Sequence, residues 1–116
     1  MRPKVTVSIV NYKTPDDVIA CIKSILSHTK SVEVIVSDNN SGDGSAEKIK
    51  KAYPKLKCLL NNKNLGFGKA HNQAIAMAKG KYVAIVNPDI VVEKDALQML
   101  LKYGSVRKAM IANKGS

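Results

Sequence analysis

Short apolar runs alternate with longer amphipathic segments along most of the 116-residue chain. Four of the runs are short and rich in β-branched residues, a pattern typical of strands that are covered on both faces. The four predicted strands are residues 5–10, 32–37, 57–60 and 81–86. After each strand the apolar positions recur at helical spacing. This predicts one helix that begins at Pro15 and others over residues 45–53, 67–79 and 95–103.

Local signals mark where these helices start and stop. Thr14 is expected to cap the first helix and Pro15 to occupy its first position. Pro54 should end the second helix, and Gly80 is a typical C-terminal stop for the third. The first helix should bury one apolar stripe, formed by Val18, Ile22, Ile25 and Leu26.

Strands that alternate with helices of about ten residues favour right-handed crossovers and a mostly parallel sheet. We therefore predict an α/β fold of four βα units, with helices on both faces of the sheet. Residues 1–104 are assigned to this domain. Residues 105–116 are expected to be a tail, either loosely ordered or an artificial end of the chain.

The net charge is +10, from 19 Lys and Arg against nine Asp and Glu. Such a charge suits nucleic acid, an anionic membrane or a phosphorylated ligand. The lysines are scattered apart from Lys48, Lys50 and Lys51, and only four Tyr and one Phe could stack on bases. Nucleic-acid binding is therefore a secondary interpretation.

Two further features bear on the class of protein. Cys21 and Cys58 lack metal-ligand spacing, so we expect both to be small apolar core residues. No apolar stretch approaches the roughly 18 residues of a membrane span. We expect a cytoplasmic protein, with attachment to a membrane surface as the alternative.

Polar residues follow all four predicted strands, and in an open parallel sheet ligands bind beyond these carboxyl ends. The residues are Asn11, Tyr12 and Lys13; Asp38, Asn39 and Asn40; Asn61, Asn62 and Asn64; and Asn87, Pro88 and Asp89. Each loop alone could simply be a turn, since Asn, Asp and Pro are turn formers. Their occurrence in all four loops favours one shared ligand site.

The absence of two common motifs reduces the range of possible ligands. The first loop contains no glycine, which excludes the Gly-x-Gly-x-x-Gly turn of dinucleotide binders, and there is no Gly-Lys-Ser/Thr phosphate loop. Gly66-Phe67-Gly68 follows the third strand and is explained as a turn that opens a helix. Asp89 could hold Mg²⁺, which often takes one or two carboxylates plus substrate phosphates. The alternative is that Asp89 forms a turn or caps the next helix.

Three stretches in order, "VSIVNYK", "VIVSDNNSGDGS" and "NNKNLGFGKAHNQAIAMAKGKYVAIVNPD", resemble the nucleotide-binding half of family 2 glycosyltransferases. The resemblance extends from Val5 to about Leu101 and is strongest to the rhamnosyltransferase-like branch. It implies the Rossmann-like GT-A fold and a set of nucleotide-binding residues. These are Asn11, Tyr12 and Asp38 near the base, Asn40 in the second loop, Asn64, Gly66 and Asn72 near the ribose and diphosphate, and Asn87.

The same resemblance implies the chemistry. Asp89 matches the last acid of the Asp-x-Asp metal motif, with Asn87 in place of the first, and the cofactor would be Mg²⁺ or Mn²⁺. The donor would be a UDP- or dTDP-sugar, and inverting transfer would go to a hydroxyl of a glycan or lipid-linked sugar. The general base belongs to the half that follows, so no catalytic residue is assigned. Glu93 and Asp95 read as the start of a helix.

Two alternatives stay open beside a glycosyltransferase donor domain: a noncatalytic nucleotide-binding module, and a basic protein that binds nucleic acid or membranes. A half-domain would also leave an open sheet edge at the fourth strand. Open edges recruit partners, so we expect a homo-oligomer.

Overall fold

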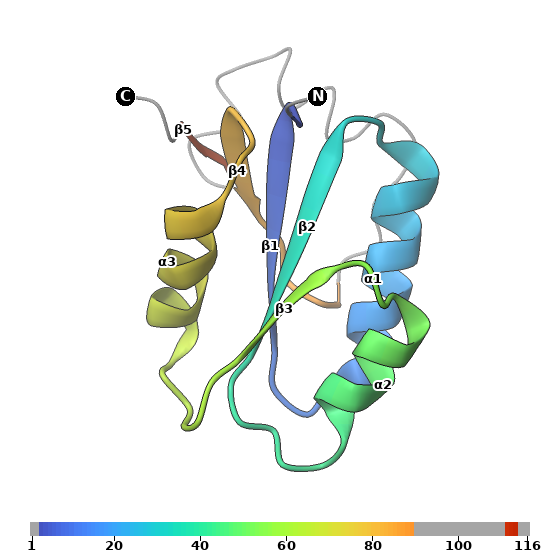
Figure 1. The fold of residues 1–116 in the computed structure, drawn as a ribbon, viewed down its shortest axis with the longest axis vertical. Coiled ribbons are helices and arrows are strands. Elements are labelled where there is room, and N and C mark those ends of the chain that lie inside the picture. The colour runs from blue at the N-terminus through green and yellow to red at the C-terminus, as the bar shows by residue number, and fades with distance from the viewer. Residues whose placement is uncertain (1–2, 90–110, 114–116) are drawn as a thin grey trace.

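The structure, a computed structural model, describes residues 3–89 and 111–113 and contains one twisted sheet (Figure 1). Its strands are β1 (Val5–Asn11), β2 (Val32–Asp38), β3 (Lys57–Leu60), β4 (Tyr82–Ile85) and β5 (Ile111–Asn113). The order across the sheet is β3-β2-β1-β4-β5. The first four strands are parallel and β5 runs antiparallel to β4. The predicted α/β fold with a mostly parallel sheet is confirmed.

Three helices connect the parallel strands: α1 (Pro15–His28), α2 (Ser45–Ala52) and α3 (Phe67–Met77). α1 and α2 lie on one side of the sheet and α3 lies on the other (Figure 1). The expected helices on both faces are therefore present. The fourth expected helix, residues 95–103, lies outside the described residues.

The face under α1 and α2 is an apolar core. It consists of Val5, Val7, Ile9, Val18, Cys21, Ile22, Ile25, Val34, Val36, Ile49, Ala84 and Val86. One predicted member is wrong, because Leu26 is 42% exposed. Leu26 lies one residue beyond Ile25, about 100° further around the helix, and so falls outside the stripe. Cys21 takes its place in the buried face, as the sequence predicted for this thiol.

The face under α3 combines buried hydroxyls with apolar residues such as Ile35 and Val83, which alternate with the core residues of the other face. Thr6, Ser8 and Ser37 are fully buried there, opposite Ala70 and Ala74 of α3. α3 ends at Met77 and Ala78 is extended, so Gly80 is not the predicted helix stop. A Cβ at Gly80 would lie 2.5 Å from the Thr6 backbone nitrogen. The glycine allows the chain to pass close to β1, where its N–H donates to Thr6 Oγ1 at 2.9 Å.

The edge of β4 differs from the sequence expectation. β5 falls within residues 105–116, the expected tail, and pairs over Tyr82–Ala84 of β4. The edge that we expected to be open is therefore covered by the chain itself over these residues. A homo-oligomer remains a prediction, but this edge no longer supports it.

Candidate functional site

An amide and a carboxylate end the two central strands side by side. Asn11 and Asp38 are the last residues of β1 and β2 and are register partners. Asn11 Nδ2 donates to Asp38 Oδ1 at 2.7 Å. Both side chains are buried. Each strand runs one residue further than the sequence predicted, so both groups belong to the rigid sheet rather than to loops.

Ser41 closes this pair into a network. Its hydroxyl donates to Asp38 Oδ1 at 2.7 Å and its backbone N–H donates to Asp38 Oδ2 at 3.1 Å. The same hydroxyl oxygen accepts from Asn11 Nδ2 at 3.1 Å and from the Lys13 N–H at 3.0 Å. A carboxylate offers about four acceptor positions. Internal donors fill three of those on Asp38, which leaves one on Oδ2 for a ligand.

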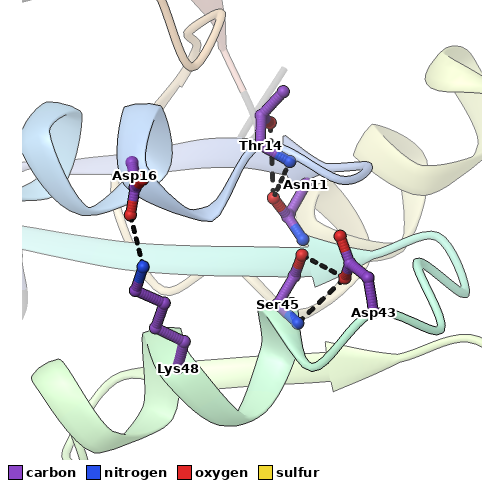
Figure 2. A network of polar contacts seen from close by, with 6 residues as sticks. All are labelled: Asn11, Thr14, Asp16, Asp43, Ser45 and Lys48. Atoms are coloured by element: carbon purple, nitrogen blue, oxygen red, sulfur yellow. Dashed lines mark hydrogen bonds and ion pairs between the residues drawn. The ribbon is translucent and has the colours of Figure 1, made fainter.

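Asn11 also fixes the loop that enters α1. Its Oδ1 accepts from the N–H of Thr14 at 3.2 Å and from the Thr14 hydroxyl at 3.3 Å (Figure 2). Thr14 occupies the predicted N-cap position, but its side chain makes no capping bond to α1, because the hydroxyl donates to Asn11 instead. Pro15 does start the helix as predicted. The first loop is thereby tied to the Asn11–Asp38 pair.

Asn39 ties the loops after β2 and β3 together. Its Nδ2 donates to the Gly66 carbonyl at 3.2 Å, and its Oδ1 accepts from Asn61 Nδ2 at 3.1 Å. Asn61 Oδ1 in turn accepts from Gln73 Nε2 of α3 at 2.9 Å. The loop after β2 is thus joined to the loop after β3, which in turn is joined to α3.

The turn before α3 depends on two predicted residues. Asn64 Oδ1 accepts from the Gly66 N–H at 2.8 Å. Gly66 has a φ of 80°, in the left-handed region that favours glycine. Both residues are exposed, as is Asn72 on α3. Asn64 and Gly66 therefore shape this turn, and Asn72 is exposed to solvent beside it.

A pocket of about 380 Å³ opens beside Asp38. It is lined by Asp38, Asn40, Gly42, Gly44, Ser45, Ala46, Glu47, Leu60 and Asn61. Of the predicted site residues it contains Asp38 and Asn40. Leu60, which is 60% exposed, adds an apolar wall. The other predicted residues do not line this pocket: Asn11 is buried next to it, and Tyr12 is 45% exposed in the first loop.

The second loop leads into α2 through a short polar turn (Figure 2). The Ser45 hydroxyl and the Ser45 N–H both donate to Asp43 Oδ1. These hydrogen bonds lower the pKa of Asp43 below its ordinary value, first through the hydroxyl and then through the N–H. Asp16 and Lys48 join α1 to α2 at 2.6 Å, but both are exposed, so this ion pair adds little stability.

The end of β4 presents Asn87 and Asp89 with exposed side chains. Asp89 lies close enough to α1 to act on Cys21, whose pKa is raised to about 11 by burial and then by the Asp89 charge. The Cys21 thiol also points at the Asn87 carbonyl, with Sγ and O 4.0 Å apart. Within residues 3–89 and 111–113, no three His, Cys, Asp or Glu side chains cluster as a metal site.

The oxygen-only donors at the end of β4 nevertheless fit a hard divalent cation, which often binds one or two carboxylates and completes its shell with substrate phosphates and water. Asp89 would supply a carboxylate and Asn87 an amide oxygen. A softer metal that prefers sulfur or imidazole ligands does not fit these two groups.

Several contributing residues were missed from the sequence. Ser41, Gly42, Gly44 and Ser45 were not among the predicted site residues, although they stand in the quoted stretch "SDNNSGDGS". Asn39 and Asn61 were noted only as loop residues. The signal was the density of Ser, Gly and Asn, which adopt turns and bind backbone groups.

Comparison with known proteins places these features in context. The family model of Glycosyl transferase family 2 matches residues 6–111. The succinoglycan biosynthesis protein ExoO of Rhizobium meliloti is 29% identical over 112 residues, which cover 95% of this chain and 32% of that protein. The UDP-Glc:alpha-D-GlcNAc-diphosphoundecaprenol beta-1,3-glucosyltransferase WfaP of Escherichia coli is 34% identical over 87 residues, covering 73% of this chain and 35% of that protein.

Among solved structures, the mannosyltransferase PcManGT of Pyrobaculum calidifontis, in complex with GDP-Man and Mn²⁺, superposes with a TM-score of 0.76. It is 26% identical, and the match covers 89% of this chain and 32% of that chain. The chain therefore spans about a third of the length of these relatives. No helix in the described part of the chain is long and apolar enough to cross a membrane.

Proposed function

The chain belongs to Glycosyl transferase family 2, and from this we propose that it binds the donor of a sugar-transfer reaction, a nucleoside diphosphate sugar. The observation that carries the proposal is the polar network at the carboxyl edge, where Asn11, Asp38 and Ser41 join the first two loops beside a pocket that the second and third loops line. Ligands bind in open parallel sheets at this edge.

The pocket beside Asp38 suits the nucleobase. Its volume of about 380 Å³ lies within the range of ligand pockets. The remaining acceptor position on Asp38 would take a ring N–H, and Leu60 would cover an apolar face of the ring. Uracil and thymine carry such an N–H, as does guanine, whereas adenine and cytosine do not, so the contact is compatible with the UDP- or dTDP-sugars that we propose and does not by itself separate them from a GDP-sugar. The name of WfaP specifies UDP-Glc, and PcManGT was solved with GDP-Man.

Charge at the carboxyl edge explains why a cation would be needed. In the described residues this edge carries four lysines, Lys13, Lys48, Lys63 and Lys69. It carries six acids, Asp16, Asp17, Asp38, Asp43, Glu47 and Asp89. Such an edge repels a diphosphate. A divalent cation, Mg²⁺ or Mn²⁺, would offset the charge that develops on the leaving diphosphate. Asp89 and Asn87 would hold it, and PcManGT was solved with Mn²⁺.

The acceptor side of the proposed reaction lies beyond these residues. A general base must take the proton of the acceptor hydroxyl. No described residue is assigned to that role, and Glu93 and Asp95 lie outside the described residues. An acceptor that is a glycan or a lipid-linked sugar is part of the proposal; the name of WfaP specifies a diphosphoundecaprenol-linked sugar.

Calorimetric titration tests the proposal. UDP, dTDP and GDP are each titrated with and without Mg²⁺ or Mn²⁺, and we expect tight binding of UDP or dTDP only with the metal. Asp89→Ala should weaken metal-dependent binding at least about tenfold, since it removes the charged ligand. The matched control is Asp17→Ala, an exposed acid at the same edge that forms no hydrogen bond in the described structure.

A second variant addresses the pocket separately. Leu60→Glu adds a negative charge at the pocket wall without disturbing the core, because Leu60 is exposed. It should weaken nucleotide binding while far-UV circular dichroism stays unchanged. Nucleotide binding that needs no metal and tolerates both Asp89→Ala and Leu60→Glu would refute the proposal. Binding without sugar transfer by the full-length protein would favour a noncatalytic module.

A further inference from the structure

Lysines gather at the end of the sheet opposite the candidate site. Eight of them flank the amino ends of β1 to β4: Lys4, Lys30, Lys50, Lys51, Lys55, Lys57, Lys79 and Lys81. We call these eight residues the amino-end lysine surface. In the described residues this end carries one acid, Glu33. The carboxyl edge holds more acids than lysines, so the positive charge of the described chain is concentrated at the amino end.

The strand starts place these lysines near one another. The Lys4 N–H donates to the Ser31 carbonyl at 2.9 Å, and the Tyr82 N–H donates to the Lys4 carbonyl at 3.2 Å. Lys4, Lys30 and Lys81 therefore flank three adjacent strand starts, which lie at the same end of the sheet (Figure 1).

The lysines near α2 and β3 are set back from Lys4, Lys30 and Lys81. Lys57 pairs with Ile35, three residues after the start of β2. At about 3.3 Å per residue, the start of β3 lies roughly 10 Å behind that of β2. The amino-end lysine surface thus slopes from the starts of β4, β1 and β2 toward α2 and β3.

Most of this charge lies at the protein surface, and the Lys81 ammonium lies 5.6 Å from the centre of the Tyr82 ring. Seven of the eight lysines are exposed and Lys57 is half-buried. The Glu33 carboxylate is already hydrogen-bonded, since its Oε1 accepts from Thr6 Oγ1 at 2.8 Å and from the backbone N–H of Lys79 at 2.9 Å. Within the part of the chain that the structure describes, the salt bridge that forms, Lys48–Asp16, lies at the other edge.

Helix stability explains only part of the arrangement. Lys50 and Lys51 stand in the last turn of α2, where a cation offsets the helix dipole. Lys4, Lys30, Lys55 and Lys81 lie outside the helices, in the segments that flank the strands. The dipole gives no reason for these four.

We infer that the amino-end lysine surface docks the protein onto a bilayer that contains anionic phospholipids. Compact, hydrated ammonium groups on short connecting segments match a flat layer of phosphate headgroups, and each lysine near such a surface contributes about 1 kcal/mol, or roughly fivefold in binding. Single-stranded nucleic acid would need stacking rings as well as charge. The tyrosines at this end, Tyr53 and Tyr82, are half-buried.

Docking in this way turns the nucleotide pocket away from the bilayer. β1 has seven residues, so its two ends lie roughly 20 Å apart. The donor could then enter from the aqueous side without competing with lipid headgroups. Of the two acceptor classes in the proposed function, this orientation favours a glycan in solution over a lipid-linked sugar anchored in the same bilayer. The inference does not depend on the proposed function, because it concerns the opposite end of the sheet.

Flotation with vesicles tests the inference. The 116-residue chain is mixed with phosphatidylcholine vesicles that contain either no anionic lipid or 30% phosphatidylglycerol, in 0.1 M NaCl. We expect binding to the anionic vesicles only, and release in 0.5 M NaCl. The triple variant Lys4→Gln/Lys30→Gln/Lys81→Gln should bind about a hundredfold more weakly, from roughly fivefold per lysine.

The matched control removes the same net charge elsewhere. In Lys23→Gln/Lys63→Gln/Lys69→Gln the substituted residues lie midway along α1 and at the carboxyl edge, and all three are exposed. This control should lose less than about threefold, because the distant charges are screened. Far-UV circular dichroism confirms that both variants are folded.

Three results would overturn the inference. The first is equal loss of vesicle binding in both triple variants, which would indicate a net-charge effect without a surface. The second is equal binding to vesicles with and without phosphatidylglycerol. The third is preferential, salt-sensitive binding of duplex DNA that the amino-end variant alone abolishes, which would assign the surface to nucleic acid. Nucleotide titrations are unaffected by these outcomes, so a failure here is distinct from failure of the proposed function.

Discussion

The two faces of the sheet are packed by different means. Under α1 and α2, β1 contributes Val5, Val7 and Ile9 to a continuous apolar core. Under α3, the alternate residues of the same strand include Thr6 and Ser8, which are fully buried and hydrogen-bonded. β1 therefore supplies an apolar face on one side and, on the other, two buried hydroxyls followed by Val10, because successive side chains point to opposite sides. We call the second side the hydroxyl face.

The difference shows what each face requires of its helix. α1 and α2 contribute bulky side chains that interdigitate with those of the sheet, and their contribution depends on filled volume. α3 contributes alanines and approaches the backbone, so directed contacts hold it: Ser8 Oγ lies 2.7 Å from His71 Nδ1 and Ser37 Oγ donates to the Ala70 carbonyl at 3.3 Å. On the face under α1 and α2, loss of side-chain volume should lower the free energy of unfolding most. On the face under α3, loss of a hydrogen-bond partner or an added methyl group should lower it.

The largest effect is expected for Ile22→Ala on the apolar face. Ile22 is fully buried in the core, and the substitution leaves a cavity. We expect the free energy of unfolding to fall by about 3–4 kcal/mol. Urea denaturation followed by far-UV circular dichroism measures it, which suits a chain without Trp. Leu26→Ala on the same helix is the control and should cost under about 1 kcal/mol, since Leu26 is partly exposed.

Gly80→Ala probes added bulk on the hydroxyl face. The new methyl group would collide with the β1 backbone at Thr6 and Val5, so the two segments must separate. We expect a loss of about 2 kcal/mol in the same denaturation assay. Gly68→Ala is the control, because Gly68 lies in α3 and its added Cβ would meet no atom of the described residues within 4 Å. That control should stabilise by about 0.5–1 kcal/mol. Equal effects of the two alanines would contradict close approach at Gly80.

Ser8→Ala probes lost partners. Among the residues that the structure describes, His71 Nε2 has no hydrogen-bond partner, and the substitution would leave Nδ1 without one as well. We expect a loss of about 1–2 kcal/mol, the cost of an unsatisfied buried group. The double variant Ser8→Ala/His71→Leu removes both members and should recover part of that loss. Strictly additive losses in this cycle would show that the pair does not interact.

The smallest effect is a pH dependence due to His71. Burial lowers the pKa of His71 below its ordinary value of 6.5, because the charged form is poorly solvated there. The stability from the neutral ring is fully present above pH 6.5 and is lost as the pH falls through the lower folded pKa. Denaturation midpoints at pH 8 and pH 5 should show this decline. His71→Leu should remove its share of the decline, while His28→Gln, on the surface, should leave the decline in place.

Much of the fold could be predicted from the sequence because its signals are local. The apolar runs gave all four parallel strands to within one or two residues, and Pro15 marked the start of α1. Strand order and the β4–β5 pairing could not be predicted, since they join segments far apart in the chain. The close approach at Gly80 was missed for the same reason: it depends on Thr6, 74 residues away.

The candidate site was predicted in outline but not in detail. Topology placed Asn11 and Asp38 at one edge, because the carboxyl ends of parallel strands coincide. Their bonding to each other and to Ser41 required atomic positions, since an exposed Asn and a bonded one look alike in a sequence. Asn39 and Asn61 read as turn residues, although they hold the loops together. The roles proposed for Tyr12, Asn72, Asn87 and Asp89 remain predictions.

The buried thiol of Cys21 makes the opening of α1 measurable by thiol modification. It lies fully within the apolar core, where burial raises its pKa further above neutral pH. Alkylating reagents can reach it only when α1 lifts from the sheet, so the rate of modification counts such openings. Cys58 on β3 is only half-buried and should be alkylated sooner. The two alkylation rates would therefore measure the accessibility of β3 and of the core under α1 in the same experiment.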